Sequence, residues 1–167
     1  MGQPLHTGGW NNTFNFYGFD LNVFFSWSYG NDILNANRLM FEYYDGSQLN
    51  QFGSMRNAFS VNRNPESDIP RAGARGMEYY SSRVVEDGSF LRLKTLTLGY
   101  TIPGRILEKV KISSLRVYLT GDNLLTITNY SGPDPEVSTR NSVLTPGFDW
   151  SAYPRARTIT GGISLTF

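Results

Sequence analysis

Hydrophobic and polar residues alternate along five stretches of this chain, at residues 10–17, 20–29, 89–101, 114–127 and 157–167. The last stretch shows the pattern most clearly, because one parity is apolar and the other is polar. Its apolar parity contains Ile159, Gly161, Ile163, Leu165 and Phe167, and its polar parity contains Thr158, Thr160, Gly162, Ser164 and Thr166. A period of two residues indicates a β-strand with one apolar face. We therefore expect an all-β protein built from antiparallel strands.

Short and long connections alternate between these strands. Tyr17-Gly18-Phe19-Asp20 supplies a glycine turn after the first strand, and residues 102–113 form the other short link. Residues 30–88 and 128–156 lack the alternation and are rich in Gly, Pro, Asn and Ser, which is typical of loops. Loops of this length are uncommon in compact soluble domains. Short turns on one side and long extracellular loops on the other are typical of an outer-membrane β-barrel.

The first long loop contains one candidate helix. Apolar residues recur there at helical spacing, at Ile33, Ala36, Met40 and Tyr43. Asp32 is placed to cap the N-terminus of such a helix. We expect a short helix from Asp32 to Tyr44, and at most one or two helical turns at residues 105–112.

The apolar parity changes within the strand at residues 89–101. The apolar positions are odd before the change and even after it: Leu91 and Leu93, then Leu96, Leu98 and Tyr100. Either a β-bulge near Lys94 shifts the phase, or the later leucines point inward onto something packed in the barrel lumen. In both interpretations Arg92 and Lys94 face away from lipid, because a basic side chain facing lipid at the midplane costs about 2–4 kcal/mol.

The composition narrows the choice of protein class. Only 40% of the residues are hydrophobic and no apolar run is long enough for a transmembrane helix, whereas a chain with 14% aromatic residues and 17 glycines suits barrel strands and turns. A net charge of +1 gives no indication of a nucleic-acid partner, and the absence of cysteine excludes disulfides and thiolate metal sites.

Five strands cannot close a barrel, so we expect the C-terminal piece of a larger one. The N-terminus lacks a secretory signal pattern, so Met1 is not expected to be the natural start of an exported protein.

Several segments together resemble one protein family. They are SFLRLKTLTLGYTIP (89–103), ISSLRVYLTGDNLLTITNYSGPDPEVS (112–138), GFDWSAYPRART (147–158) and ITGGISLTF (159–167). In this order they resemble the C-terminus of the SusC/RagA family of TonB-dependent outer-membrane transporters, and residues 8–42 are similar to the same family. The resemblance covers most of the chain except residues 45–83.

The resemblance implies a transmembrane barrel of about 22 strands with an N-terminal plug, in which this chain supplies the last five strands. It implies a multi-pass protein of a Gram-negative outer membrane that imports oligosaccharides or peptides. The expected partners are a SusD-like surface lipoprotein, the TonB–ExbB–ExbD complex, the barrel-assembly machinery and outer-membrane lipid. Phe167, with Leu165 and Ile163 before it, resembles the signal that the assembly machinery reads.

No catalytic set is visible in the sequence. Asp134 and Glu136 could suggest paired acids or a calcium site, but the spacing of an EF-hand is missing. We expect these carboxylates, like Glu42, to be solvated. No strand presents the acid pair of a glycosidase. The chain is therefore expected to be no enzyme and to hold no cofactor or metal.

Aromatic side chains in the long loops are the better binding candidates, because sugar rings stack on aromatic faces. Trp150 and Tyr153, with Arg155 nearby, lie in the second long loop, and Tyr79 and Tyr80 lie late in the first. The alternative is that these residues pack the loops together or against the lipoprotein. For the whole chain the alternative to a transporter fragment is a soluble glycan-binding β-sandwich, whose apolar strand faces would pack on a second sheet.

Overall fold

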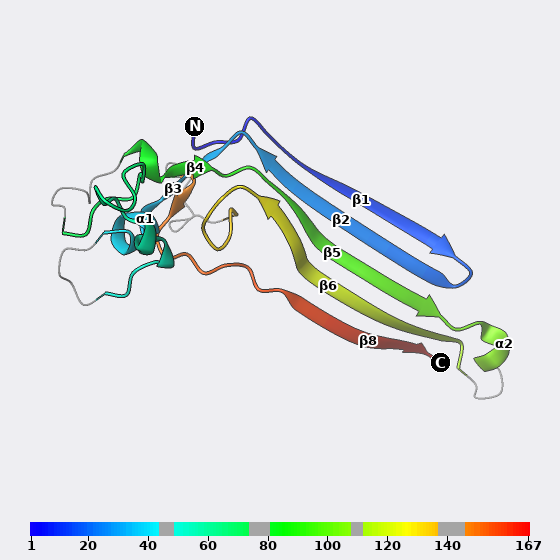
Figure 1. Cartoon of the computed structure of the whole chain (residues 1–167). Coiled ribbons are helices and arrows are strands. Elements are labelled where there is room, and N and C mark those ends of the chain that lie inside the picture. The colour runs from blue at the N-terminus through cyan, green and yellow to red at the C-terminus, as the bar shows by residue number, and fades with distance from the viewer. Residues whose placement is uncertain (44–48, 74–80, 108–111, 137–145) are drawn as a thin grey trace. The chain divides into compact units, whose positions relative to one another are not determined.

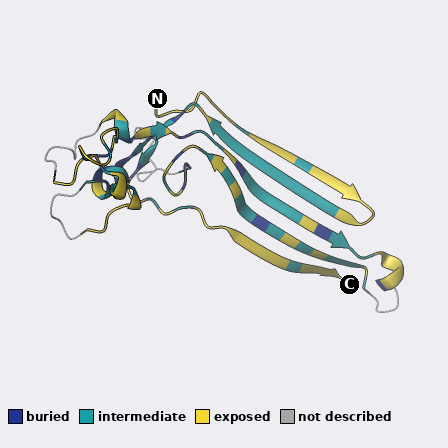
Figure 2. Cartoon of the chain, in the orientation of Figure 1, coloured by how far each residue is buried: buried dark blue, intermediate teal, exposed yellow. Residues whose placement is uncertain are grey.

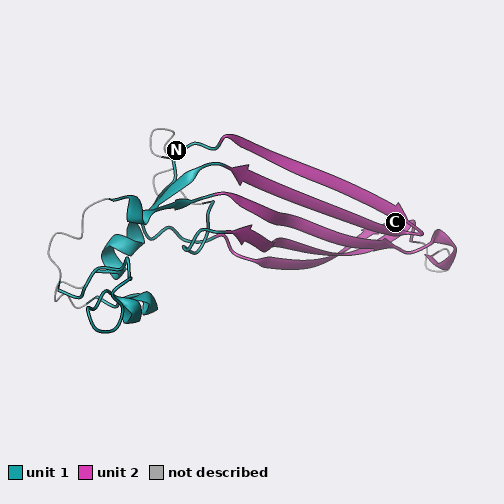
Figure 3. Cartoon of the chain, turned by 45° about the horizontal axis from the view of Figure 1, so that its top comes forward, with its two compact units in different colours: residues 1–4, 30–88, 129–154 teal, residues 5–29, 89–128, 155–167 magenta. Residues whose placement is uncertain are grey.

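The structure, a computed structural model, describes residues 1–43, 49–73, 81–107, 112–136 and 146–167. The chain forms two compact units (Figure 3). Unit 1 contains residues 1–4, 30–88 and 129–154, and unit 2 contains residues 5–29, 89–128 and 155–167. The two predicted long loops therefore form most of unit 1, and the five predicted strands form most of unit 2.

Unit 2 is an antiparallel sheet of five strands in the order β1-β2-β5-β6-β8 (Figure 1). Its strands are β1 (His6–Phe16), β2 (Phe19–Tyr29), β5 (Phe90–Thr101), β6 (Ser114–Thr128) and β8 (Thr158–Thr166). Each strand pairs with the next strand of the unit along the chain. The predicted antiparallel all-β fold is therefore confirmed.

Strand β1 begins at His6, ahead of the start predicted at residue 10. The extension contains Gly8, which lies before the start of the predicted strand. Gly8 lies opposite Trp27 in the register, and a Cβ on Gly8 would lie 2.3 Å from Cζ2 of that indole. Glycine continues the strand here because it leaves room for the tryptophan ring.

Tyr17 and Gly18 form the turn between β1 and β2. Their φ angles are 46° and 83°, and the flanking Phe16 and Phe19 are paired. Positive φ at both central residues is what a type I′ hairpin turn requires. The turn therefore occupies the first half of the predicted four-residue segment, and Asp20 already belongs to β2.

A β-bulge at Lys94 explains the parity change in β5. Phe25 of β2 pairs with Leu93, and the preceding Phe24 pairs with Thr95, so Lys94 is the extra residue. Leucines on both sides of the bulge lie opposite odd-numbered residues of β2, in the pairs Trp27–Leu91, Phe25–Leu93, Val23–Leu96 and Leu21–Leu98. Because opposite residues of an antiparallel pair share a face, all four leucines lie on one face. The bulge interpretation is confirmed, and the interpretation with inward leucines is wrong.

One face of this sheet is apolar and exposed. On this face Leu98 lies opposite Leu119, and Val117 lies opposite Ile163. Leu165, two residues after Ile163 in β8, belongs to the same face. Ile159 is 69% exposed and Ile163 is 67% exposed, and Figure 2 shows most of β8 as exposed. The described part of unit 2 contains no second sheet. The described part of unit 2 therefore lacks, by itself, the two inner faces of a β-sandwich.

The described part of unit 1 contains a three-stranded sheet in the order β4-β3-β7 and three short helices. These elements are β3 (Asp32–Asn35), α1 (Ala36–Phe41), η1 (Gly53–Asn57), η2 (Ser82–Val84), β4 (Val85–Asp87) and β7 (Phe148–Asp149). Its buried apolar residues include Ile33, Ala36, Leu39, Ile69 and Val84. This part of the chain therefore has a small core of its own, although its composition is typical of loops.

The helix predicted from Asp32 is wrong in its N-terminal part. Residues 32–35 form strand β3, and α1 starts only at Ala36. In β3, Ile33 pairs with Glu86 and Leu34 pairs with Phe148. Pairing with distant segments therefore overrides the local helical spacing.

The remaining helix, α2 (Gly104–Leu107), lies within the segment where one or two turns were expected. Residues 108–111 of that segment lie outside the described ones. None of the described helices has the length and hydrophobicity needed to cross a membrane.

Candidate functional site

Hydrogen bonds between neighbouring strands hold the polar face of the sheet in unit 2. Thr95 Oγ1 donates to Asp122 Oδ1 at 3.0 Å, which joins β5 to β6. Asn22 Nδ2 donates to Asn11 Oδ1 and to Thr13 Oγ1, each at 2.9 Å, which joins β2 to β1. These hydrogen bonds join polar side chains of neighbouring strands on this face.

An ion pair spans three strands on the same face. Arg116 of β6 donates from Nε to Oδ1 of Asp20 in β2 at 2.9 Å, and its Nη2 lies 2.5 Å from Oδ2. Gly99 of the intervening β5 lies beneath the pair, because a Cβ there would be 2.4 Å from Asp20 Oδ1 and 2.5 Å from Arg116 Nη2. The bidentate contact therefore depends on a residue without a side chain at position 99.

Arg92 also lies on the polar face. It is 2% exposed, stands opposite Ser26 and Thr126 in the register, and places its guanidinium carbon 5.5 Å from the centre of the Phe90 ring. The prediction that Arg92 points away from the apolar face is confirmed. Lys94 is the bulge residue, and the direction of its side chain stays a prediction.

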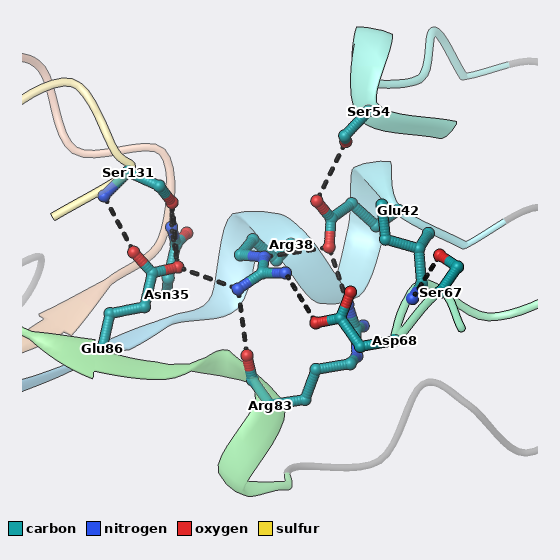
Figure 4. A network of polar contacts seen from close by, with 10 residues as sticks. Asn35, Arg38, Glu42, Ser54, Ser67, Asp68, Arg83, Glu86 and Ser131 are labelled. Atoms are coloured by element: carbon teal, nitrogen blue, oxygen red, sulfur yellow. Dashed lines mark hydrogen bonds and ion pairs between the residues drawn. The ribbon is translucent and has the colours of Figure 1, made fainter. Parts of the chain in front are cut away.

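In unit 1, Arg38 of α1 joins segments that are far apart in sequence (Figure 4). Its Nε donates to Glu42 Oε2 at 2.9 Å, and its Nη1 donates to the backbone oxygen of Arg83 at 3.0 Å and to Glu86 Oε1 at 3.2 Å. A longer ion pair of 4.0 Å links Nη2 to Asp68 Oδ2. One guanidinium thus ties the helix to the β4 region, 45 to 48 residues later in the chain.

Glu42 is the second centre of this network. Ser54 Oγ donates to its Oε1 at 2.9 Å, and Arg83 Nη1 donates to its Oε2 at 2.6 Å. Burial by itself raises the pKa of Glu42, but the hydrogen bonds from Ser54, Arg38 and Arg83 outweigh it and hold the pKa below its usual value. Burial likewise lowers the pKa of Arg38, and the contacts with Glu42 and Glu86 raise it more. Both groups are therefore charged at neutral pH.

Glu86 extends the network to a third segment. Its Oε2 accepts the backbone N–H of Ser131 at 2.8 Å, and its Oε1 accepts Ser131 Oγ at 2.9 Å. Asn35 Nδ2 also donates to Glu86 Oε1, at 3.2 Å. The two long stretches of unit 1 are thereby joined through one carboxylate.

Tyr130 and Asp149 form a buried pair elsewhere in unit 1. They are 5% and 1% exposed, and the tyrosine hydroxyl donates to Asp149 Oδ2. The backbone N–H of Ala152 donates to Asp149 Oδ1 at 3.3 Å. Burial, followed by the neighbouring carboxylate, raises the pKa of Tyr130 far above its usual value. The neutral phenol therefore fixes the segment around Trp150.

Comparisons with known proteins identify the family of this chain. The chain is 40% identical to TonB-dependent receptor P3 of Formosa agariphila over 98% of its length, covering 16% of that receptor. It is 33% identical to the TonB-dependent receptor SusC of Bacteroides thetaiotaomicron over 80% of its length, covering 13% of SusC. Solved structures of the RagAB peptide importer in closed-closed and open-open states match 99% of the chain, and 18% and 17% of theirs, with a TM-score of 0.82 and 32% identity.

The chain belongs to the SusC/RagA family of TonB-dependent receptors. It spans less than a fifth of the length of each of these relatives. No protein-family model matches it. The predicted family and the predicted barrel-fragment fold are confirmed, and the relatives carry the names of receptors and importers, not of enzymes.

The structure describes three of the five residues that sequence reasoning proposed as cargo contacts, namely Trp150, Tyr153 and Arg155. Trp150 is 41% exposed and stacks on Phe148, with ring centres 6.4 Å apart and an interplanar angle of 11°. Tyr153 is 90% exposed in the same unit, whereas Arg155 belongs to unit 2. Tyr79 and Tyr80 lie outside the described residues. A role for any of them in binding stays a prediction.

Two carboxylates expected to be solvated are buried. Glu42 is 4% exposed, and its carboxylate is paired with Arg38 and Arg83 and accepts a hydrogen bond from Ser54. Asp134 is also 4% exposed, and its Oδ1 accepts the backbone N–H of Glu136 at 2.9 Å. The expectation of solvation is therefore wrong for both. An Asp carboxylate that accepts the backbone N–H two residues later stabilises a turn. Pro133 and Pro135, on either side of Asp134, were the sequence signal for this turn.

Sequence reasoning missed the Arg38 network as a whole. The spacing of Arg38 and Glu42, four residues apart, was a visible signal for a helical ion pair. No local signal pointed to Arg83 or Glu86, because both reach α1 from a distant segment. At the other end of the chain, Phe167 is 85% exposed and Leu165 is 49% exposed, which leaves their predicted role in assembly untested.

Proposed function

We propose that this chain is part of the C-terminal barrel wall of an outer-membrane transporter that imports oligosaccharides or peptides together with a SusD-like lipoprotein. One observation carries the proposal: a single antiparallel sheet exposes an apolar face, while hydrogen bonds join polar side chains of neighbouring strands on the opposite face. Each exposed apolar Å² costs about 25 cal/mol in water. Hydrocarbon on one side and a polar lumen on the other remove that cost.

The proposed placement of unit 1 is extracellular. It contains both long connections, whereas the short turn at Tyr17-Gly18 and the link around α2 lie at the opposite strand ends and are assigned to the periplasmic side. In this arrangement Trp150, Tyr153 and Arg155, with Tyr79 and Tyr80, are candidates for contact with the cargo. The TonB–ExbB–ExbD complex supplies energy through other parts of the full-length transporter, and the assembly machinery reads Phe167, Leu165 and Ile163.

Site-directed spin labelling of the full-length transporter in lipid tests this placement. The chain has no cysteine, so single cysteines introduced here carry the only labels of this segment. Nitroxides at Ile159 and Ile163 are expected to be more accessible to oxygen, which concentrates in lipid, than to a water-soluble nickel chelate. Labels at Thr160 and Ser164 are expected to show the reverse. Accessibility without this alternation would contradict the membrane assignment.

Import itself is tested by growth. A strain lacking the full-length gene is supplied with single oligosaccharides or peptides as the carbon source, and the intact gene is expected to restore growth on at least one of them. If it restores growth on none, the transport proposal fails even where the membrane placement holds. No hydrolysis is expected from the purified transporter, since the proposal gives it no enzymatic role.

A further inference from the structure

Unit 1 contains a cavity of about 650 Å³, and the described residues that line it do not include Trp150, Tyr153 or Arg155. Its walls come from β3, α1, η1 and the segments at residues 131–133 and 151–152. The lining residues used below are Asn37, Arg38, Phe41, Glu42, Phe52 and Ala152. A volume of this size is in the range of small-molecule sites, which are mostly apolar with a few placed polar groups.

The charges beside this cavity are already paired. Arg38 contacts Glu42 and Glu86, and Arg83 contacts Glu42, so two cations face two carboxylates at 2.6 to 3.2 Å. The side chains are 6% to 17% exposed, and a charged ligand would have to compete with these pairs. The cavity therefore favours a neutral ligand.

Two aromatic rings form an apolar wall. The rings of Phe41 and Phe52 are 5.2 Å apart and inclined at 45°, and Phe52 is 42% exposed. An aromatic face carries partial negative charge and attracts the weakly positive C–H groups of a flat ligand face. Pro133 and Ala152 add apolar surface to the lining.

Asn37 supplies hydrogen-bond donors to the cavity. Its Oδ1 accepts the backbone N–H of Ser151 at 2.7 Å, which fixes the orientation of the amide because a backbone N–H only donates. Nδ2 of Asn37 makes no hydrogen bond with any described residue, and Asn37, which is 9% exposed, lines the cavity. Two N–H groups are therefore available to an oxygen of a bound molecule.

We propose that this cavity binds one neutral sugar residue of an oligosaccharide, with its C–H face on Phe52 and Phe41 and a hydroxyl or ring oxygen accepting from Asn37 Nδ2. The proposal rests on the proposed import function, because the sugar arrives as cargo. A neutral sugar combines an apolar face with oxygen acceptors and needs no counter-charge. A sulfated sugar or the charged ends of a short peptide would meet ion pairs that are already complete.

The test is calorimetric titration of the purified full-length transporter in detergent with maltose, cellobiose and laminaribiose, and with a sulfated heparin disaccharide and trialanine for comparison. Asn37→Asp keeps the acceptor for Ser151 and removes the free donors, and Phe52→Leu keeps apolar volume and removes the ring. Asn57→Asp and Phe59→Leu are the matched controls, because both residues are exposed in unit 1 and neither lines the cavity. Heat-modifiable migration in gels checks that each variant is folded.

At least one neutral disaccharide is expected to bind the wild type, and each cavity variant is expected to weaken it about two- to tenfold, the worth of one hydrogen bond or ring contact. The controls are expected to bind like the wild type. The proposal is overturned if no neutral disaccharide binds, if the cavity variants bind normally, or if the sulfated sugar or the peptide binds more tightly. Growth of strains that carry the same variants distinguishes failure of the sugar site from failure of the import function. If the cavity variants show unchanged uptake and unchanged binding, only the sugar site is contradicted. If the intact gene supports no import at all, the transport function is contradicted.

Discussion

The ring of Tyr118 covers Gly162, its partner in the register between β6 and β8. A Cβ on Gly162 would lie 2.3 Å from Cζ of the tyrosine, far inside van der Waals contact. The neighbouring Gly161 lies on the other face, where a Cβ would meet nothing closer than Leu119 Cδ1 at 3.9 Å. Two adjacent glycines of β8 therefore have opposite tolerance for a side chain.

Gly162→Ala is expected to destabilise the full-length barrel by about 1–3 kcal/mol, because Tyr118 has to leave its position. Gly161→Ala is the matched control and is expected to leave stability within about 0.5 kcal/mol. The measurement is the denaturant midpoint of the folded barrel, followed by its heat-modifiable migration. Adding Tyr118→Ser to Gly162→Ala is expected to recover part of the loss. Equal effects of the two alanines would contradict the packing argument.

The ion pair of Asp20 with Arg116 gives a second prediction. Asp20→Asn is expected to lower the denaturant midpoint of the folded barrel, because a bidentate contact between charges becomes a weaker one. Asp122→Asn on the same face is the control, since Asp122 accepts only the hydroxyl of Thr95 in the sheet contacts described. Gly99→Ala, which pushes the pair apart, is expected to cost at least as much as Asp20→Asn. A larger effect of Asp122→Asn would be evidence against the pair.

Much of unit 2 could be predicted from the sequence because its signals are local. Alternation in β8 and the turn glycine at position 18 each arise within a few residues. The bulge at Lys94 was one of two interpretations of a parity change, and only the pairing with Phe24 and Phe25 distinguishes them. The register between β2 and β5 thus distinguishes the two interpretations, which the sequence pattern of β5 alone leaves open.

Unit 1 shows why the rest could not be predicted. Residues 32–35 have helical spacing, but they form a strand because β4 and β7 supply partners from far along the chain. The burial of Glu42 depends in the same way on Arg83, which is 41 residues away. Neither partner has a signal near α1, so local patterns predict a helix from Asp32 and a solvated Glu42 instead.

Acid is expected to loosen unit 1 through Glu42. Its pKa is held below the usual 4.5 in the folded protein, so its ion pairs contribute stability above about that pH and lose it as the pH falls through the folded value. The measurement is hydrogen exchange of the α1 amides in the full-length protein between pH 7 and pH 3.5, corrected for intrinsic rates. Glu42→Gln is expected to loosen α1 already at pH 7, by about 3 kcal/mol. Glu66→Gln, at an exposed position, is the control. If the exchange of the α1 amides still depends on pH in Glu42→Gln, a group other than Glu42 causes the loosening.

Trp150 allows the cargo-contact proposal to be separated from a packing role. If the indole stacks on cargo, Trp150→Ala is expected to lower uptake by the full-length transporter several-fold, because the apolar contact between cargo and ring is lost, while the amount of folded barrel stays the same. Trp150→Phe keeps a ring that can still stack on Phe148, whose ring lies 6.4 Å from the indole, and is expected to retain most of the uptake. Uptake by whole cells and the folded fraction in gels are measured on the same cultures. Normal uptake in Trp150→Ala would show that the half-exposed indole only packs against Phe148, and a parallel loss of folded barrel would assign it to the stability of unit 1.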